Sequence, residues 1–301
     1  MERIYILGLG ALGGMYASKL KDNGIPVRII ASRERAEKLA HSGISVNGKS
    51  YHFDFLVPGD PVPPADLLLV AVKSHHLPEA IREMKPFIGK DTVIISLLNG
   101  ITSEEIIGAE VGMEHLLYAF ALGMDVGRIG TEIRYINMGR IVFGEAKNTT
   151  LSPRVAAVKE LFERAQVPHR IPEDMLRAQW SKFMMNVGVN QVSAILRGTY
   201  GMFRQNQDAR ELMLSAFREV IALSQPSGVA LNDADIQEIL NILDSLSEGG
   251  KTSMLQDIEA GRKTEVDIFG GVVIEMGKKL GILTPVNEAL VHIIRVLEER
   301  V

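Results

Sequence analysis

The chain has 301 residues, of which 46% are hydrophobic, with a formal net charge of −4 and no cysteine. This length allows two domains, the weak negative charge gives no general attraction to nucleic acid or anionic membranes, and the lack of cysteine excludes disulfides, thiolate catalysis and cysteine-ligated metals. Strand-like residues begin at once and no apolar run reaches the roughly 20 residues of a membrane helix, so we expect a cytoplasmic protein without signal peptide or membrane anchor.

The first predicted unit runs from residue 3 to residue 31. It combines a buried strand (3–7), a helix (11–20) and a second strand (27–31). A G-x-G-x-x-G pattern joins the first strand to the helix, the context that a dinucleotide-binding turn requires. Its glycines permit a tight turn and close approach of a pyrophosphate to the helix N-terminus. We therefore predict that the turn binds a dinucleotide through Gly8, Leu9, Gly10, Ala11, Leu12 and Gly13.

The residues after the second strand bear on the choice of dinucleotide. An acidic side chain there would bind the ribose 2′-hydroxyl of NAD. Instead the chain has Ser32 and Arg33, with Arg35 close by. A hydroxyl and a planar guanidinium suit a 2′-phosphate, so we favour NADP(H) over NAD, although Glu34 and Glu37 weigh against this reading.

Two later strands end in polar residues. Residues 65–72 and 92–98 form continuous apolar runs of the kind buried in a parallel sheet, and they lead into Lys73 and Asn99. Ligands of open parallel sheets bind outside the carboxyl ends of strands. We therefore expect Lys73 and Asn99 near a nicotinamide ribose or a substrate. The adjacent His75 and His76 read as surface residues rather than metal ligands.

The domain boundary is predicted near Ile171. Strands at 116–124, 132–136 and 140–144 are expected to close the first domain. A helix (151–166) and a last strand (167–171) follow, and Pro168 and Pro172 mark the boundary. Everything beyond reads as helix. The predicted fold is α/β, with an N-terminal Rossmann-type dinucleotide-binding domain (1–171) and a C-terminal all-helical domain (172–301). We expect the helical domain to form the substrate wall and a homodimer contact.

A polar row marks the first long helix of the second domain. Lys182, Asn186 and Asn190 recur at steps of four within an apolar run. On an α-helix each such step drifts only about 40°, so the three share one face. One interpretation is a row of donors facing a small polar ligand, with the lysine able to give up a proton. The other is a buried helix whose polar groups cap loops or meet another subunit.

A second polar row follows later in the chain. Ser253 and Asp257 share a helical face, and Glu265 lies two further helical steps along if the helix is unbroken. Gly261 makes that continuity conditional. No histidine or carboxylate cluster has the spacing of metal ligands, so we expect no metal.

Taken in order, these motifs resemble the ketopantoate reductase (2-dehydropantoate 2-reductase) family. The resemblance covers nearly the whole chain and is most specific in the lysine–asparagine helix and in the segments 253–257 and 264–265. It implies NADPH-dependent reduction of 2-dehydropantoate to (R)-pantoate, a step of pantothenate and coenzyme A biosynthesis. Other readings are a related reductase of another 2-keto acid, or a non-catalytic NADP sensor, which would require loss of the donor lysine.

The resemblance also implies roles for individual residues. Lys182 matches the proton donor of the family. The matches to its substrate-binding residues are Asn99, Asn186, Asn190 and Ser253, and its cofactor contacts fall on the glycine turn, Ser32 or Arg33, Lys73, Asn99 and Glu265. One departure concerns an asparagine contact that the family often has shortly after the helix. This chain instead reads Arg197-Gly-Thr-Tyr200-Gly201, so the far end of the substrate is expected to be held differently.

Overall fold

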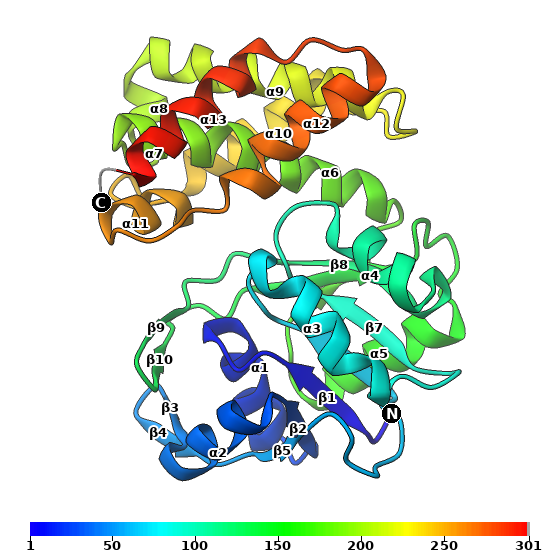
Figure 1. Ribbon diagram of the computed structural model, residues 1–301. Coiled ribbons are helices and arrows are strands. Elements are labelled where there is room, and N and C mark those ends of the chain that lie inside the picture. The colour runs from blue at the N-terminus through cyan, green and yellow to red at the C-terminus, as the bar shows by residue number, and fades with distance from the viewer. Residues whose placement is uncertain (300–301) are drawn as a thin grey trace. The chain divides into compact units, whose positions relative to one another are not determined.

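The computed structural model describes residues 1–299 and divides into two compact units, Met1–Met175 and Leu176–Val301 (Figure 1). The predicted division falls slightly earlier, after Ile171. The first unit contains all the strands and the second is helical. This arrangement confirms the predicted fold class.

The first unit is organised around an eight-stranded sheet. Its strand order is β12-β11-β8-β7-β6-β1-β2-β5, parallel throughout except that β11 runs antiparallel to β8. In that order the strands are His169–Arg170, Arg140–Gly144, Leu116–Leu122, Val93–Ser96, Leu67–Val70, Ile4–Leu7, Val27–Ile30 and Asp54–Leu56. The central strands β1, β6 and β7 are buried along their whole length, as parallel strands covered on both faces require.

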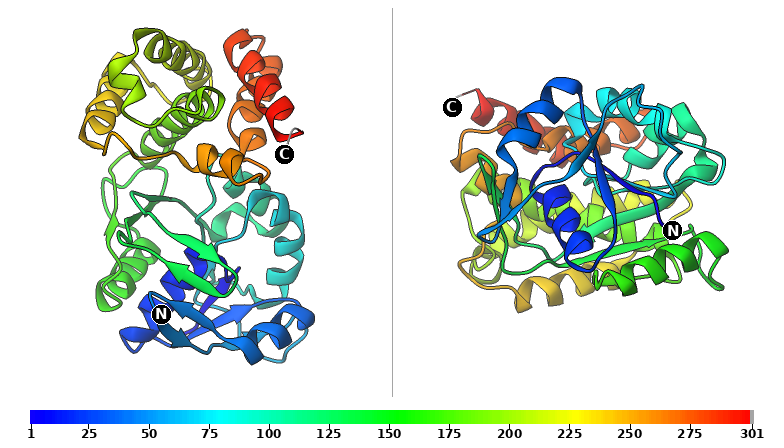
Figure 2. Two further views of the ribbon diagram at one scale, coloured as in Figure 1. Left: turned by 90° about the vertical axis from the view of Figure 1, so that its left-hand side faces the viewer. Right: turned by 90° about the horizontal axis from the view of Figure 1, so that it is seen from below.

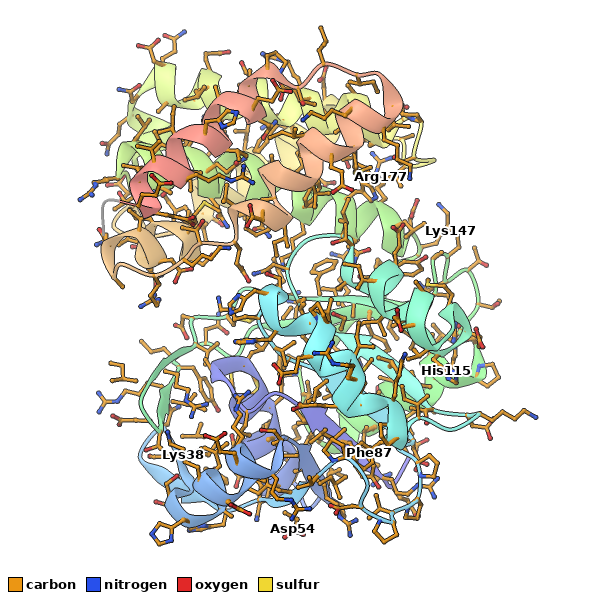
Figure 3. All side chains as sticks on the ribbon, viewed as in Figure 1. Lys38, Asp54, Phe87, His115, Lys147 and Arg177 are labelled. Atoms are coloured by element: carbon orange, nitrogen blue, oxygen red, sulfur yellow. The ribbon has the colours of Figure 1, made fainter. Side chains whose placement is uncertain are left out.

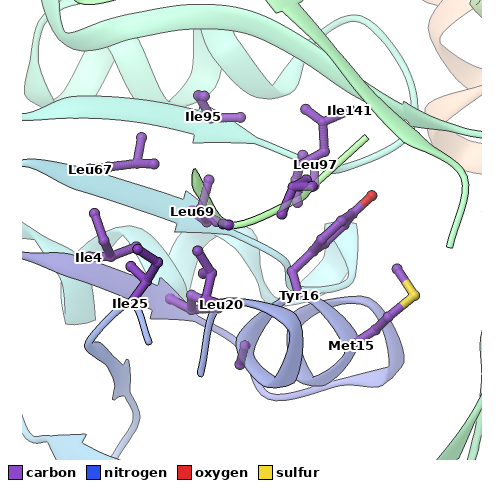
Figure 4. Close-up of a cluster of buried hydrophobic side chains, with 14 of the residues drawn as sticks. Ile4, Met15, Tyr16, Leu20, Ile25, Leu67, Leu69, Ile95, Leu97 and Ile141 are labelled. Carbon is purple, nitrogen blue, oxygen red and sulfur yellow. The ribbon is translucent and has the colours of Figure 1, made fainter. Parts of the chain in front are cut away.

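Helices cover both faces of this sheet. They are α1 (Ala11–Asp22), α2 (Arg33–Ser42), α3 (Leu77–Met84), α4 (Ser103–Val111) and α5 (Pro153–Arg164), with 3-10 turns η1 (Ser74–His76), η2 (Lys85–Phe87) and η3 (Met113–His115). Figure 4 shows Ile4, Leu67 and Ile95 of the sheet in one buried cluster with Tyr16 and Leu20 of α1. Each such buried side chain contributes roughly 1.5–3 kcal/mol, so this cluster fixes α1 against the strands.

A second, four-stranded sheet lies in the same unit and was not predicted. Its order is β4-β3-β10-β9, formed by Lys49–Tyr51, Ile44–Val46, Glu132–Arg134 and Gly127–Ile129. The strand predicted at 132–136 in the first domain forms as β10, but it belongs to this small sheet rather than to the main one. This small sheet packs on α1, because a Cβ at Gly14 would lie 2.3 Å from Cδ1 of Ile133 in β10. Glycine at position 14 thus permits the close approach.

The register of the main sheet aligns the carboxyl ends of four strands. Leu7 pairs with Ile30 on one side and with Val70 on the other, and Val70 pairs with Ser96. The four residues form one row across the sheet, and each is the last residue of its strand. The loops after β1, β2, β6 and β7 therefore leave from the same edge, where ligands of such sheets bind.

The second unit consists of helices. They are α6 (Met175–Met185), the π-helical segment η4 (Asn186–Asn190), α7 (Gln191–Leu196), α8 (Met202–Gln205), α9 (Gln207–Ser224), α10 (Asp233–Ser245), α11 (Ser253–Glu259), the 3-10 turn η5 (Val266–Ile268), α12 (Gly270–Leu280) and α13 (Pro285–Glu298). The last two lie side by side (Figure 2). None of the helices in the described chain is long and apolar enough to cross a membrane.

An ion pair between a half-buried arginine and a buried carboxylate fixes the start of this unit. Arg177 of α6, labelled in Figure 3, donates from Nε and Nη2 to the Asp235 carboxylate at 3.1 and 2.8 Å. Asp235 is only 4% exposed and also accepts from the backbone N–H of Asn232, closing a capping box on α10. The pair connects α6 to the first turn of α10, so the start of the lysine–asparagine helix is held in place.

Candidate active site

The glycine turn has the geometry that its sequence predicts. Gly8 follows β1 with φ +99°, and a Cβ there would lie 2.7 Å from the carbonyl oxygen of Ala71. At Gly13 a Cβ would lie only 1.9 Å from the carbonyl oxygen of Gly8. Both positions therefore require glycine, one for its backbone conformation and both for the close approach of main chain.

The start of α1 fits an anionic ligand. Gly10 caps the helix without a side-chain hydrogen bond, and the first turn contains no acidic residue. The first N–H groups of a helix have no partner within it and carry partial positive charge. A Cβ at Gly10 would meet nothing nearer than 3.9 Å, so the backbone there is open to close approach. Residues 8–13 thus fit the pyrophosphate of a dinucleotide.

Ser32 and Arg33 stand at the same edge of the sheet. Ser32 is the N-cap of α2 but makes no side-chain capping bond, and Arg33 is exposed at the first position of the helix. The backbone N–H of Ala31 donates to Leu56 of β5, which fixes the strand just before the loop. Both side chains thus lie at the end of β2, beside the strand that carries the glycine turn.

Lys73 and Asn99 follow β6 and β7 at this edge. Lys73 is the N-cap of η1, and Asn99 lies three residues beyond Ser96. The structure therefore gathers every candidate cofactor residue of the first unit at one edge of the sheet.

A buried polar network supports the loop that carries Asn99. Ser96 donates through its hydroxyl to Ser103 at 2.8 Å, and Ser103 donates to Glu104 at 2.9 Å. The other carboxylate oxygen of Glu104 accepts from the backbone N–H of Ala119 in β8 at 3.3 Å. Glu104 is 1% exposed, so these bonds compensate the burial of its carboxylate. The network ties the end of β7 to α4 and β8.

The lysine–asparagine helix contains a π turn that the sequence did not predict. Lys182 lies on α6, and η4 extends from Asn186 to Asn190 before α7 continues the same helix. Four residues advance an α-helix by about 40° beyond one turn. A π turn, with its i→i+5 bonds, needs more than four residues per turn. Across the π turn, the step from Asn186 to Asn190 covers less than one full turn, which reverses the rotation of the step from Lys182 to Asn186. Asn190 is therefore closer in angle to Lys182 than in a continuous α-helix, and the row is straighter than predicted.

Buried side chains hold this π turn. Gln191 donates from Nε2 to the carbonyl oxygen of Val187 at 2.8 Å and to Oδ1 of Asn287 at 2.9 Å. Asn287 in turn donates from Nδ2 to Glu219 at 2.6 Å. Gln191 and Asn287 are both fully buried. Gly188 completes the packing, because a Cβ there would lie 2.3 Å from the Phe217 ring of α9.

Replacing Gln191 tests how much this network contributes. Gln191→Leu would remove the donor that Gln191 Nε2 provides to the buried Asn287 Oδ1, and a buried acceptor left unpaired costs about 1–3 kcal/mol. We expect the free energy of unfolding, measured by chemical denaturation, to fall by about 1–3 kcal/mol. The matched control is Gln237→Leu, because Gln237 makes a similar bond to Asn241 at 3.0 Å on the surface. For Gln237→Leu the free energy of unfolding should fall by no more than about 0.5 kcal/mol. Equal decreases in the two variants would contradict a stabilising role of the buried Gln191 network.

Asn190 and Ser253 come together in the second unit. Asn190 Nδ2 lies 3.5 Å from Ser253 Oγ, at the limit of a hydrogen bond. Their elements are joined by buried hydroxyls, since Thr252, the N-cap of α11, donates to Ser193 of α7 at 3.1 Å. Asn190 is buried and Ser253 exposed, so the pair links the helix interior to the surface.

Glu265 does not continue the row of Ser253 and Asp257. Helix α11 ends at Glu259, and Gly261 adopts φ +64°. Glu265 follows this break as the N-cap of η5. The condition of an unbroken helix therefore fails. Asp257 accepts from Arg262 Nε at 2.8 Å, which gives this buried carboxylate a structural partner.

The departure near Tyr200 has a defined structure. Arg197 ends α7 in the left-handed conformation, with φ +50°. The backbone N–H of Tyr200 donates to Gly250 at 2.9 Å, and a Cβ at Gly250 would lie 2.8 Å from the tyrosine ring. Burial raises the pKa of the Tyr200 phenol. The tyrosine ring thus packs on the loop that leads into Thr252 and α11.

Arg128 is a residue that sequence reasoning missed. It lies in β9 and donates through Nη1 to the carbonyl oxygen of Leu9, inside the glycine turn. Position 128 belongs to a three-residue strand far along the chain, so no local motif indicated it.

Comparisons with known proteins cover nearly the whole chain. The sequence models "Ketopantoate reductase PanE/ApbA" and "Ketopantoate reductase PanE/ApbA C terminal" match residues 4–148 and 174–298. The 2-dehydropantoate 2-reductase of Pyrococcus horikoshii is 26% identical, over 98% of this chain and 97% of the relative. A 2-dehydropantoate 2-reductase structure from Geobacter metallireducens superposes with TM-score 0.84 at 27% identity, over 97% and 99% of the two chains. D-mandelate dehydrogenase with NADH gives 0.87 at 21%, over 99% of each.

Proposed function

Because the chain belongs to the ketopantoate reductase family of oxidoreductases, we propose that it reduces 2-dehydropantoate to (R)-pantoate with NADPH. The observation that carries this proposal is the row of Lys182, Asn186 and Asn190, straightened by a π turn and continued by Ser253. It offers an amine and amides, the donors that a 2-keto acid needs. π turns inside α-helices frequently occur at functional sites.

The proposed chemistry gives Lys182 the catalytic role and gives the other polar residues of the row the binding of the substrate. Bound NADPH supplies a hydride to the 2-keto carbon, which leaves negative charge on the carbonyl oxygen. The Lys182 ammonium stabilises that charge and donates the proton that completes the hydroxyl. Asn186, Asn190 and Ser253 orient the acid through hydrogen bonds and add no charge of their own.

Substrate identity is tested by turnover across a panel. We expect kcat/KM for 2-dehydropantoate to exceed that for pyruvate, 2-oxoisovalerate and phenylglyoxylate. Higher kcat/KM for another acid would favour the second candidate, a reductase of a different 2-keto acid. The segment Arg197–Gly201 supports this alternative, because it lacks the asparagine contact that the family often has shortly after the helix, and D-mandelate dehydrogenase shares the fold.

The preference for NADP is proposed from the end of β2. Arg33 begins α2 with an exposed guanidinium, which suits the dianionic 2′-phosphate. We expect Arg33→Ala to raise the KM of NADPH about tenfold and to leave that of NADH nearly unchanged, since a charge-assisted bond contributes about 1.5–3 kcal/mol. Arg82→Ala on α3 is a control in the same unit. Equal losses with both cofactors would rule out contact with the 2′-phosphate.

A homodimer through the helical unit belongs to the same proposal. Large apolar side chains are exposed around α13, with Ile293 at 45%, Val296 at 48% and Leu283 of the preceding loop at 87%. Ile293 and Val296 are three residues apart on α13 and share one helical face, and exposed apolar side chains on one face are typical of protein contacts. Light scattering of the purified chain tests this, because a dimer has twice the mass of 33.1 kDa.

A further inference from the structure

Arg128 faces the glycine turn because of the register of the small sheet. In the antiparallel pair of β9 and β10, Arg128 lies directly opposite Ile133. Side chains of directly opposed residues project from the same face of a sheet. Ile133 packs against Gly14 of α1, so Arg128 shares the face that covers the start of this helix.

Its hydrogen bonds use only part of the guanidinium. Nε donates to the carbonyl oxygen of Gly130 at 2.8 Å, which holds the side chain on its own hairpin, and Nη1 donates to Leu9. Both acceptors are neutral main-chain oxygens. Among residues 1–299, Arg128 forms no ion pair, and Nη2 has no hydrogen-bond partner. An arginine fork has five N–H donors, so several remain for a ligand.

The charge of Arg128 is not balanced by neighbouring residues. Burial lowers the pKa of its guanidinium, and repulsion from Arg35 of α2 lowers it further. Arg35 also acts on Glu83 of α3, whose own pKa is raised by burial. Two arginines thus lie near each other, and Arg128 itself has no carboxylate paired to it in the described chain. A half-buried cation without a counterion is costly, and a bound anion would relieve that cost.

We propose that Arg128 binds the pyrophosphate of the dinucleotide beside the glycine turn. The inference rests on the proposed cofactor site and extends it to the small sheet. Its contact with Leu9 directs Arg128 to the part of the turn that a pyrophosphate approaches. Arg33, at the end of β2, is instead assigned to the 2′-phosphate. The two arginines therefore divide the phosphates of NADP between them.

Binding measurements with four ligands separate these assignments. We expect Arg128→Gln to weaken NADPH, NADH and ADP-ribose by a common factor of about tenfold, because all three contain the pyrophosphate. Adenosine 2′-monophosphate, which lacks it, should bind as in the wild type. Arg33→Ala should give the opposite pattern, weakening NADPH and adenosine 2′-monophosphate only. Isothermal titration of the full chain gives each Kd without any keto acid.

Control variants guard against a folding defect. Arg134→Gln removes an exposed arginine of β10 that pairs with Glu132, and it should leave every Kd unchanged. Arg128→Lys keeps the charge but loses the fork, and should weaken the three pyrophosphate ligands by a smaller factor than Arg128→Gln.

Three results would overturn the inference. Unchanged affinities in Arg128→Gln would mean that Arg128 only stabilises the hairpin and does not contact the ligand. Weakening of NADPH and adenosine 2′-monophosphate only would assign it to the 2′-phosphate. Failure of the wild type to bind any dinucleotide would overturn the proposed function as well, whereas the first two results leave that function standing.

Discussion

Lys182→Ala should lower kcat for 2-dehydropantoate by about 10²- to 10⁴-fold, the range typical of general acid catalysis. The substitution removes both a positive charge and a proton donor from the place where negative charge develops. The lost interaction therefore stabilised mainly the transition state. The Kd of NADPH should stay within about twofold, because the glycine turn and the loops after β2, β6 and β7 belong to the other unit. Single-turnover kinetics and fluorescence titration measure the two effects separately.

The pH dependence of kcat provides a second measurement for the same residue. In the wild type kcat should fall at high pH, because a deprotonated amine has no proton to donate. Lys182→Ala should lose that high-pH limb. Lys182→Arg keeps a cation that holds its proton too tightly to donate it, so its kcat should also be low. Lys279→Ala, on the exposed end of α12, is the matched control. Near-normal kcat in Lys182→Ala would mean that the proton comes from elsewhere.

Features encoded within about 30 consecutive residues were predictable. The strand–turn–helix–strand unit from Ile4 to Ile30 depends on apolar periodicity and on the glycines at positions 8, 10 and 13. The same applies to the strands that lead to Lys73 and Asn99. Their carboxyl ends meet because parallel pairing fixes the register. The sequence therefore indicated one edge of the sheet, and the structure brings those candidate residues to it.

Features that depend on distant contacts were not predictable. The small sheet pairs three-residue strands from 44–51 with strands from 127–134, too short to show periodicity and too far apart for a local signal. Arg128 was missed for that reason. The π turn likewise depends on Asn287, which lies 96 residues from Gln191 along the chain. Residue spacing alone predicts a regular α-helix there, whereas the buried amide network stabilises a π turn.

Gly13→Ala should cost the first unit about 3 kcal/mol of folding free energy, the upper end for overpacking. Its Cβ would lie 1.9 Å from the Gly8 carbonyl oxygen. Main-chain atoms on both sides cannot rotate away as a flexible side chain would, so the turn itself must open. A loss of this size lowers the melting temperature by about 6–12 °C for a unit of this length. Thermal denaturation without ligand measures it, and NADPH binding should be lost with the turn.

Gly10→Ala separates the turn's shape from its proposed role. A Cβ at Gly10 meets only the Ala71 carbonyl oxygen at 3.9 Å, an ordinary contact, and its φ of −80° suits alanine. The melting temperature should therefore match the wild type. The Kd of NADPH should still rise about 10- to 100-fold, because the methyl group takes the space that a pyrophosphate needs against the backbone. If Gly10→Ala binds NADPH as tightly as the wild type, the dinucleotide does not lie on this turn, and the role proposed for Arg128 falls with it.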